Sequence, residues 1–509
     1  MLPSAGNCRG CQARDREIAR LQQRLEQLEK DCRRLERRLA LIEKDNRRLR
    51  TELAETRRQQ QRQASPFRRR KLKDRPKKAG RKKGHPANVR PTPPPERVDR
   101  IVAVPCRSCP DCNVDLVDPG LVVQHQTDLP PIVPFVTRFD IETGWCPCCR
   151  RRVQGRHPEQ TSNAIGAAGN TLGPVVLTMA AELKHRLGVP YRKICDFLQT
   201  YCDLKVAPAT FVRAEQRLAE RARPTFNMLL DALRRCHVVH ADETGWRVGA
   251  VNAWLWVFSN KDITIYAIRT GPGARGHEVP EEILGPDFDG FLIVDGFKAY
   301  DVLSCAKGQC NAHLLRRAKE MSETASADEA ALLQTLVELL QKAIALAERR
   351  DKLTADGYAR QVTAIKNSFE DWLTKVRRRR SNSDELWRLF VHMMKHFDEW
   401  LRFLDHAEVP PTNNHAERML RPAVVTRKIG GCNKTLLGAL VHSILASLMV
   451  TCRQQGQKFL DLARQLWAAE EPKAIPILQP PPPPRPTDSP LNETAAGPTA
   501  NDPSTTLSC

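Results

Sequence analysis

The stretch HVVHADET at residues 237–244 and the stretch GFLIVDGFKAY at residues 290–300 decide the fold of this chain. Each contains a short apolar run that leads into an aspartate, Asp242 in the first and Asp295 in the second. Two further strand-like runs lie at residues 253–259 and 263–269. We expect the four runs to form one sheet, with each aspartate where a buried strand stops, a place where α/β sheets carry functional groups.

A third carboxylate follows a helical stretch. Residues 321–404 carry periodic Leu, Ile and Trp with few helix breakers, and TNNHAERMLRP at 412–422 then places Glu417 near the start of another helix. Two strand-end aspartates and a helical glutamate match the way an RNase H-like fold gathers three carboxylates around two Mg²⁺ or Mn²⁺ ions. We therefore expect an RNase H-like α/β catalytic domain at residues 236–425, with a helical insertion at about 318–408.

Neighbouring residues compete for these roles. Glu243 follows Asp242, and alternation along a strand turns one of the two toward the site and the other away. Asp287 and Asp289 precede the apolar run that ends in Asp295, so they belong to a loop. Two other residues have alternatives that stay open: Glu417 could form a surface ion pair with Arg421, and His313 either orients a substrate phosphate or packs.

Six cysteines gather between residues 99 and 158. Paired C-x-x-C turns are typical of tetrahedral Zn²⁺ sites, because each turn presents two thiolates to one ion. The four that look most like such knuckles are Cys109, Cys112, Cys146 and Cys149, which leaves Cys106 and Cys148 as spares. With all four positions filled by protein, the ion would be structural and would take no part in chemistry. The 17 cysteines of the chain are odd in number, and this clustering favours metal binding in a reducing cytosol over disulfides.

Residues 159–235 form a helical region. Helices expected at 191–200 and 208–221, joined by a short turn, have the layout of a helix-turn-helix, and Arg213 and Arg217 lie on the second. Two interpretations fit this spacing: the second helix recognises DNA, or the two helices only pack within the protein.

The amino-terminal part, residues 1–64, contains a coiled coil. Leucine or isoleucine recurs every seven residues from Leu21 to Leu49, and a second seam runs from Leu25 to Leu53 with the polar Asn46 within it. A buried asparagine pair favours a parallel dimer, so we expect a homodimer. Cys8 and Cys11, just before the coil, have no nearby second pair and stay unassigned.

A basic arm spans residues 65–98. Half of residues 67–90 are Lys or Arg, and only Asp74 is acidic, so the arm should pair with phosphates. Arg81, Lys82 and Lys83 lie in its GRKKGH motif, which fits either a minor groove or a nonspecific basic linker. The formal net charge of the whole chain is +22, which calls for a polyanionic partner, with DNA ahead of a membrane surface.

The carboxyl-terminal part should contain helices at residues 426–471 and a disordered Pro-rich tail at 472–509. The most apolar run, residues 436–450, is interrupted by His442, Ser443 and Ser447, which predicts a buried helix. Residues 1–10 carry no apolar secretory core. These patterns favour a cytoplasmic protein with no membrane partner.

The chain resembles the insertion sequence 66 family of bacterial transposases over nearly its whole length up to about residue 470. The motifs that carry the resemblance are DET at 242–244, DGFKAY at 295–300, CNAHLLRR at 310–317 and NNHAERMLRP at 413–422, together with the coil, the basic arm and the cysteine module. The resemblance implies that Asp242, Asp295 and Glu417 are the DDE catalytic acids. It also implies cut-and-join chemistry at terminal inverted repeats, commonly alongside small accessory proteins of the same element.

The sequence thus predicts a multidomain α+β transposase that binds DNA, Mg²⁺ and structural Zn²⁺ and resides with the bacterial nucleoid. A second hypothesis is a catalytically inactive dimeric zinc-containing DNA-binding protein derived from a transposase. A third is a structure-selective nuclease of the same fold. The presence of all three acids favours the first over the second.

Overall fold

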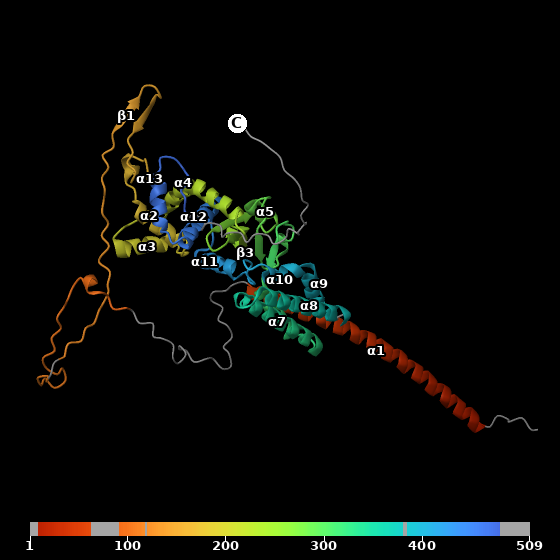
Figure 1. The fold of residues 1–509 in the computed structure, drawn as a ribbon. Helices are drawn as coiled ribbons and strands as arrows, with labels where there is room; N and C mark the ends of the chain where they lie inside the picture. The colour runs from red at the N-terminus through yellow and green to blue at the C-terminus, as the bar shows by residue number, and fades with distance from the viewer. Residues whose placement is uncertain (1–8, 63–90, 118–119, 380–383, 479–509) are drawn as a thin grey trace, which may run out of the picture.

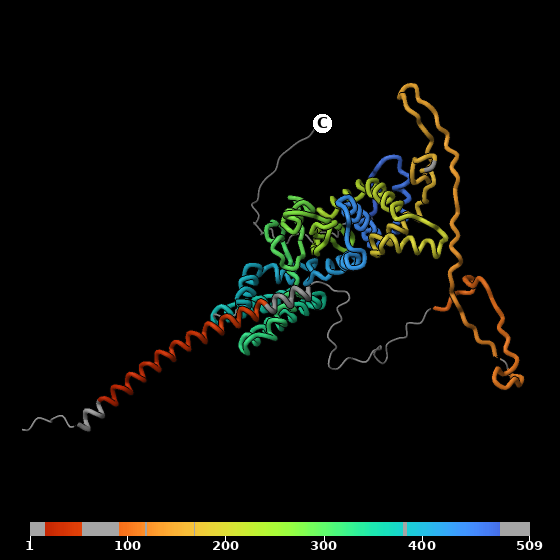
Figure 2. Tube along the Cα trace, turned by 180° about the vertical axis from the view of Figure 1, so that it is seen from behind, coloured from red at the N-terminus to blue at the C-terminus, as the bar shows by residue number. Residues whose placement is uncertain are grey.

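A computed structural model describes residues 9–62, 91–117, 120–379 and 384–478. The basic stretch 67–90 lies outside these ranges, as do Cys8 and the tail from residue 479. Helix α1 (Arg9–Arg62) projects from the body as one long rod in both views (Figures 1 and 2). The side chains of its predicted seam are all between 54% and 62% exposed: Leu21, Leu25, Leu28, Leu35, Leu39, Ile42 and Leu49. The predicted helix is present, and in this single chain its apolar stripe faces solvent.

The cysteine-containing segment is extended along most of its length (Figure 1). After the short 3-10 turn η1 (Pro95–Arg97), its regular structure in the described part is an isolated bridge between Ser108 and Asp115 and a hairpin of β1 (Thr143–Cys146) and β2 (Arg151–Gln154). Apolar side chains such as Leu121 are exposed here. This part of the chain therefore makes no core of its own.

The helical region contains η2 (Gly166–Gly169), α2 (Pro174–His185), α3 (Tyr191–Cys202) and α4 (Pro208–Arg234). The expected helix pair is present, but the prediction that its second helix ends at residue 221 is wrong. Helix α4 continues through Pro224 because its apolar face continues, with Leu229 and Leu233 fully buried. The helix packs on α2, α12 and α13, so most of one face is used for the core.

The central sheet has five strands in the order β5-β4-β3-β6-β7. They are β3 (Val238–Val248), β4 (Val251–Ser259), β5 (Thr264–Thr270), β6 (Phe291–Val294) and β7 (Lys307–Gln309). Strands β3, β4 and β5 are antiparallel neighbours, whereas β6 and β7 run parallel to β3. The four predicted strands are present, and β7 is a fifth that the sequence did not indicate.

The expectation that the first strand ends at Asp242 is wrong. Strand β3 runs on to Val248 because its second half forms a hairpin with β4, in which Asp242 pairs with Val257. The parallel pairing of β3 with β6 is what ends near Asp242. The last pair of this ladder is His240 of β3 with Ile293 of β6. Asp242 therefore lies in the middle of a strand, at the point where its parallel neighbour ends.

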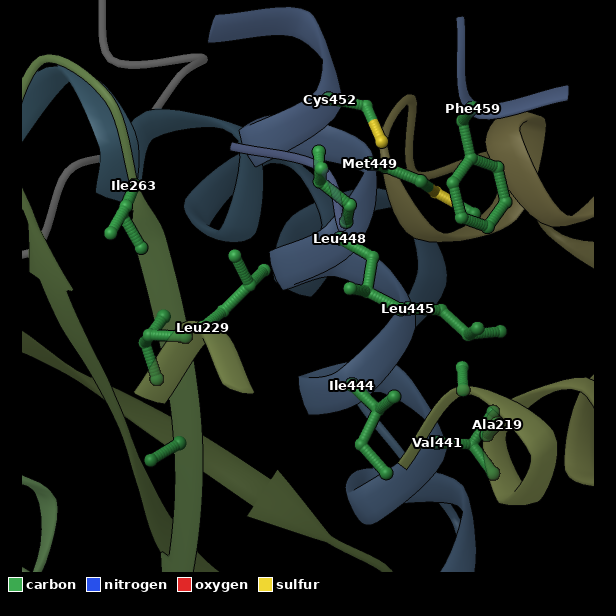
Figure 3. Packing of buried hydrophobic residues seen from close by; sticks show 14 of the residues in the cluster. Ala219, Leu229, Ile263, Val441, Ile444, Leu445, Leu448, Met449, Cys452 and Phe459 are labelled. Atoms are coloured by element: carbon green, nitrogen blue, oxygen red, sulfur yellow. The ribbon is translucent and has the colours of Figure 1, made fainter. Parts of the chain in front are cut away.

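Helices cover both faces of the sheet. On one face, α12 (Leu436–Gln454) lies between α4 and β5, with Ile444, Leu445 and Leu448 packed among their side chains (Figure 3). Helices α5 (Glu278–Leu284) and α13 (Phe459–Ala468) add to this core. Helix α11 (Asn414–Gly430) crosses the other face and contacts β3 and β4.

The interval of the predicted insertion is helical and has a core of its own. It contains α6 (Asn311–Ser322), α7 (Ala327–Ala347), α8 (Ala355–Arg379), α9 (Asp384–Lys395) and α10 (Phe397–Asp405), with the 3-10 turn η4 (Arg350–Lys352). Leu336, Phe369 and Trp372 are buried among these helices, and Ile293 of β6 joins the same cluster. The insertion is thereby attached to the sheet beside the second aspartate.

Two helices, α7 and α12, are long and apolar enough to cross a membrane by length and composition alone. Most of the apolar window of α12, 67%, is buried inside the protein. The prediction that residues 436–450 form a buried helix is therefore confirmed.

Candidate active site

The sheet register brings Asp242 and Asp295 to neighbouring positions. His240 pairs with Ile293 in the parallel ladder, so two residues further along each chain the two aspartates share one face of the sheet. Each carboxylate is also held locally by a backbone donor. The N–H of Glu243 donates to Asp242 Oδ1 at 2.8 Å, and the N–H of Phe297 donates to Asp295 Oδ1 at 3.1 Å.

A buried asparagine, Asn413, attaches the helix of the third acid to this strand. Its side-chain amide donates to the carbonyl of Ala241 at 2.7 Å, and its Oδ1 lies 2.9 Å from Nδ1 of His240. Its backbone N–H donates to the sulfur of Cys310 at 3.1 Å. Helix α11 therefore starts against the backbone next to Asp242, and Glu417 follows one turn later.

A second asparagine fixes the approach to α11. Asn311 is fully buried, and its amide donates to the carbonyls of Trp400 and Pro411, both at 3.1 Å. Its neighbour His313 places Nε2 3.5 Å from Glu417 Oε1. The motifs at 310–317 and 412–422 thus contact each other across the insertion. The sequence indicates both motifs but does not predict the contacts of Asn311, Asn413 and Cys310. The only indication in the sequence is that these polar residues lie beside apolar helical runs.

The acids repel one another electrostatically. Burial raises the pKa of Asp242 well above its usual range, and the negative charges of Asp295, Glu243 and Glu417 raise it further. Burial, and then the charge of Asp295, raises the pKa of Glu243 to about 7. A divalent cation among these carboxylates would relieve the repulsion, and hard carboxylate oxygens suit Mg²⁺ or Mn²⁺.

Within the described residues, no three His, Cys, Asp or Glu side chains already stand together as a complete set of metal ligands. The donor chemistry of Asp242, Asp295 and Glu417 nevertheless fits the cation that the sequence predicts, because each offers an anionic oxygen next to the same strand. Two-ion binding by these three residues stays a prediction.

The cysteine pairs have a common local geometry. The residue after each second cysteine, Asn113 after Cys112 and Arg150 after Cys149, has a positive φ, of 60° and 48°. A backbone N–H from the second cysteine of each pair lowers the pKa of the first, Cys109 in one pair and Cys146 in the other. Both features suit C-x-x-C knuckles, whose thiolates must be deprotonated to bind metal.

The structure does not bring the two knuckles together. The turn that holds Cys109 and Cys112 and the β1–β2 hairpin that holds Cys146 and Cys149 lie at opposite ends of the extended segment (Figures 1 and 2). Cys106 and Cys148 are exposed, and so are Cys112 and Cys149, so exposure does not separate the predicted spares from the predicted ligands. That one Zn²⁺ binds all four predicted cysteine ligands stays a prediction.

The predicted DNA contacts fall in different places. Arg81, Lys82 and Lys83 lie outside the described residues. Arg213 is exposed on α4. The guanidinium of Arg217 lies over the ring of Trp467 of α13, 5.9 Å from its centroid, so this side chain also packs within the protein.

Two family models match parts of this chain. The family model "Transposase IS66 family" matches residues 169–440, and "zinc-finger binding domain of transposase IS66" matches residues 107–150. "Uncharacterized protein y4qI" of Sinorhizobium fredii (strain NBRC 101917 / NGR234) is 23% identical over 339 residues, which cover 59% of this chain and 61% of the relative. "Uncharacterized protein y4jO" of the same strain is 27% identical over 92 residues, 18% of this chain and 29% of that protein. The chain thus spans less than two thirds of either relative.

Proposed function

Because this chain belongs to the IS66 family of transposases, we propose that it is a DDE transposase that cuts and joins DNA strands at the terminal inverted repeats of an insertion sequence. The observation that carries the proposal is the approach of Asp242, Asp295 and Glu417 to one point of the sheet. The order of the five strands, with three antiparallel strands followed by two parallel ones, supports an RNase H-like domain.

The three acids would hold two Mg²⁺ or Mn²⁺ ions, which supply a polarised nucleophile and stabilise the leaving oxygen in a phosphodiester displacement. Asp242 and Asp295 provide fixed carboxylates because backbone N–H groups orient both. Glu417 sits on a helix whose start is attached to β3 by Asn413, and His313 lies beside it. The protein's own contribution is to keep these oxygens in place before DNA arrives.

DNA is the partner that the family implies, and the basic charge of the chain fits it. Two parts of the chain would contact the phosphates or the grooves of the DNA. They are the basic arm, with Arg81, Lys82 and Lys83, and helix α4, with Arg213 and Arg217. We place the protein in the bacterial cytoplasm, on the nucleoid when bound, with small accessory proteins of the element as further partners.

An assay of metal-dependent nicking and joining tests the function. The substrate is a duplex that carries the inverted repeats flanking the gene, incubated with full-length protein and Mg²⁺. Cutting at the repeat ends followed by transfer to a target duplex supports the transposase. Binding without cutting would favour the inactive DNA-binding protein, and cutting of branched DNA without joining would favour a structure-selective nuclease.

The predicted zinc site gives a first testable outcome. Purified protein should contain about one Zn²⁺ per chain, and Cys109→Ser or Cys146→Ser should remove it because a structural site needs four ligands. The measurement is metal content by mass spectrometry of the dialysed protein. Cys106→Ser and Cys148→Ser are the matched controls and should retain the ion. Loss of zinc from either control would contradict the choice of the four ligands.

The exposed stripe of α1 gives a second outcome. We propose that it pairs with a second copy as a parallel coiled-coil dimer, since each buried leucine would contribute about 1.5–3 kcal/mol. Leu28→Lys places two like charges in the seam and should convert the dimer into a monomer in light scattering. Gln23→Lys adds the same charge on the outer face and should leave the dimer intact. A wild-type monomer, or a dimer unaffected by Leu28→Lys, would refute pairing through this stripe.

A further inference from the structure

Glu243 is a buried carboxylate beside the catalytic strand position but on the opposite face of the sheet. Its side chain is 2% exposed, although it is an ionisable carboxyl group. Arg275 donates to Oε1 from Nη2 at 2.9 Å and from Nε at 3.2 Å. The hydroxyl of Tyr300 donates to Oε2 at 3.2 Å. Both carboxylate oxygens therefore have partners, from two different loops.

The partners of Glu243 surround the loop that carries Asp295. The guanidinium of Arg275 lies between two aromatic rings, 4.1 Å from the centroid of Trp254 and 4.0 Å from that of Phe297. Phe297 is the residue whose backbone N–H donates to Asp295. Tyr300 is 1% exposed and ends the 3-10 turn η3 (Lys298–Tyr300) of the same loop.

These contacts link the strand of Asp242 to the loop of Asp295. The backbone N–H of Glu243 holds Asp242, while its carboxylate holds Tyr300 directly and Phe297 through Arg275. Charge-assisted hydrogen bonds of this kind are about twice as strong as neutral ones, and a buried acceptor that loses its donor is costly. One side chain thus fixes the loop of the second acid relative to the strand of the first.

We propose that Glu243 is a positioning residue that holds Asp295 beside Asp242, and that it is not itself a ligand of the catalytic metal. The inference rests on the proposed function in so far as Asp295 binds metal. Removal of the charge or of its Tyr300 contact leaves Asp295 in the chain but releases its loop. Second-layer contacts of this kind typically change metal affinity by about 10- to 100-fold.

The test uses full-length protein with Glu243→Gln, Tyr300→Phe and both changes together. The matched control is Glu282→Gln, which removes the charge from an exposed Arg269–Glu282 pair at 2.5 Å that does not reach the acids. Three quantities are measured: Mn²⁺ affinity by calorimetric titration, hydrogen exchange of residues 295–301, and the midpoint of thermal unfolding.

Glu243→Gln and Tyr300→Phe should each weaken Mn²⁺ binding by about tenfold or more and speed exchange in residues 295–301. The double variant should bind Mn²⁺ no more weakly than Glu243→Gln alone, because Tyr300→Phe removes one of the contacts that Glu243→Gln already weakens. The control should match wild type. A loss of metal affinity in Glu243→Gln without faster exchange in residues 295–301 would make Glu243 a ligand and overturn the proposal. If the variants bind Mn²⁺ with wild-type affinity but unfold at a lower temperature, Glu243 stabilises the fold and does not position Asp295.

Failure of the proposed function has a different signature. If wild-type protein binds no Mn²⁺ and cuts no DNA, the transposase assignment fails. Faster exchange of residues 295–301 in both variants would still support the connection between Glu243 and this loop. Unchanged exchange in both would refute the connection, whatever the metal does.

Discussion

Alanine at Asp242, Asp295 or Glu417 is expected to abolish metal-dependent strand cleavage while DNA binding persists. The loss should be on the order of 10³-fold or more, which corresponds to about 4 kcal/mol of transition-state stabilisation. Each change removes an oxygen donor from the only group of acids that the sheet register and α11 bring to one face of β3 in the described part of the chain. The basic segments that we propose to hold phosphate are elsewhere in the chain, so affinity for the repeat ends should change little.

The measurement is strand nicking with labelled repeat ends, beside a binding titration with the same DNA. Asp287→Ala and Asp289→Ala are matched controls, because both residues are exposed acids that precede β6. They should cut at the wild-type rate. Wild-type cutting by any of the three acid variants would exclude that residue from the catalytic set, and a joint loss of cutting and binding would indicate misfolding.

Replacement of Asn413 by alanine should have the second-largest effect. Asn413 is fully buried, and its side chain contacts both His240 and the carbonyl of Ala241. Its loss leaves buried polar groups without a partner, at a cost of about 1–3 kcal/mol of unfolding free energy for each. Helix α11 would also lose its attachment to β3, so cleavage should fall by more than the loss of stability explains.

Urea unfolding measures the loss of stability, and the nicking assay, run under conditions where the variant is folded, measures the loss of cleavage, so together they separate the two effects. Asn414→Ala is the matched control, since Asn414 is an exposed neighbour of the same type. The control should be close to wild type in both assays. An Asn413→Ala protein that loses stability but cuts normally would show that Asn413 supports the fold and does not position Glu417.

Local patterns in the sequence predicted much of this architecture. The apolar runs before Asp242 and Asp295, the helical periodicity of the insertion and the buried helix α12 all depend on residues that are close in sequence. The chain's place in a transposase family is confirmed by matches that cover residues 107–150 and 169–440. The three acids and the cysteine ligands stay predictions of site chemistry.

The features that were missed depend on distant partners. Strand β7 contains a lysine and a glutamine, yet it is buried because Lys307 donates to the carbonyl of Leu303 and Gln309 donates to Glu399 of α10. The extension of β3 beyond Asp242 depends on its hairpin with β4. The contact of Asn413 could not be predicted for the same reason, since nothing near it in the sequence indicates that its amide donates to the carbonyl of Ala241.

The order of the motifs along the chain affects when the active site can form during translation. Glu417 follows Asp242 by 175 positions, and α12, which packs behind the sheet, comes later still. Glu417 follows Asp295 by 122 positions, so at about 5–20 residues per second a growing chain would carry both aspartates for roughly 6 to 24 seconds before the glutamate leaves the ribosome. The basic arm and the cysteine module emerge earlier, so if they bind DNA as proposed, a nascent chain would associate with DNA before it is able to cut.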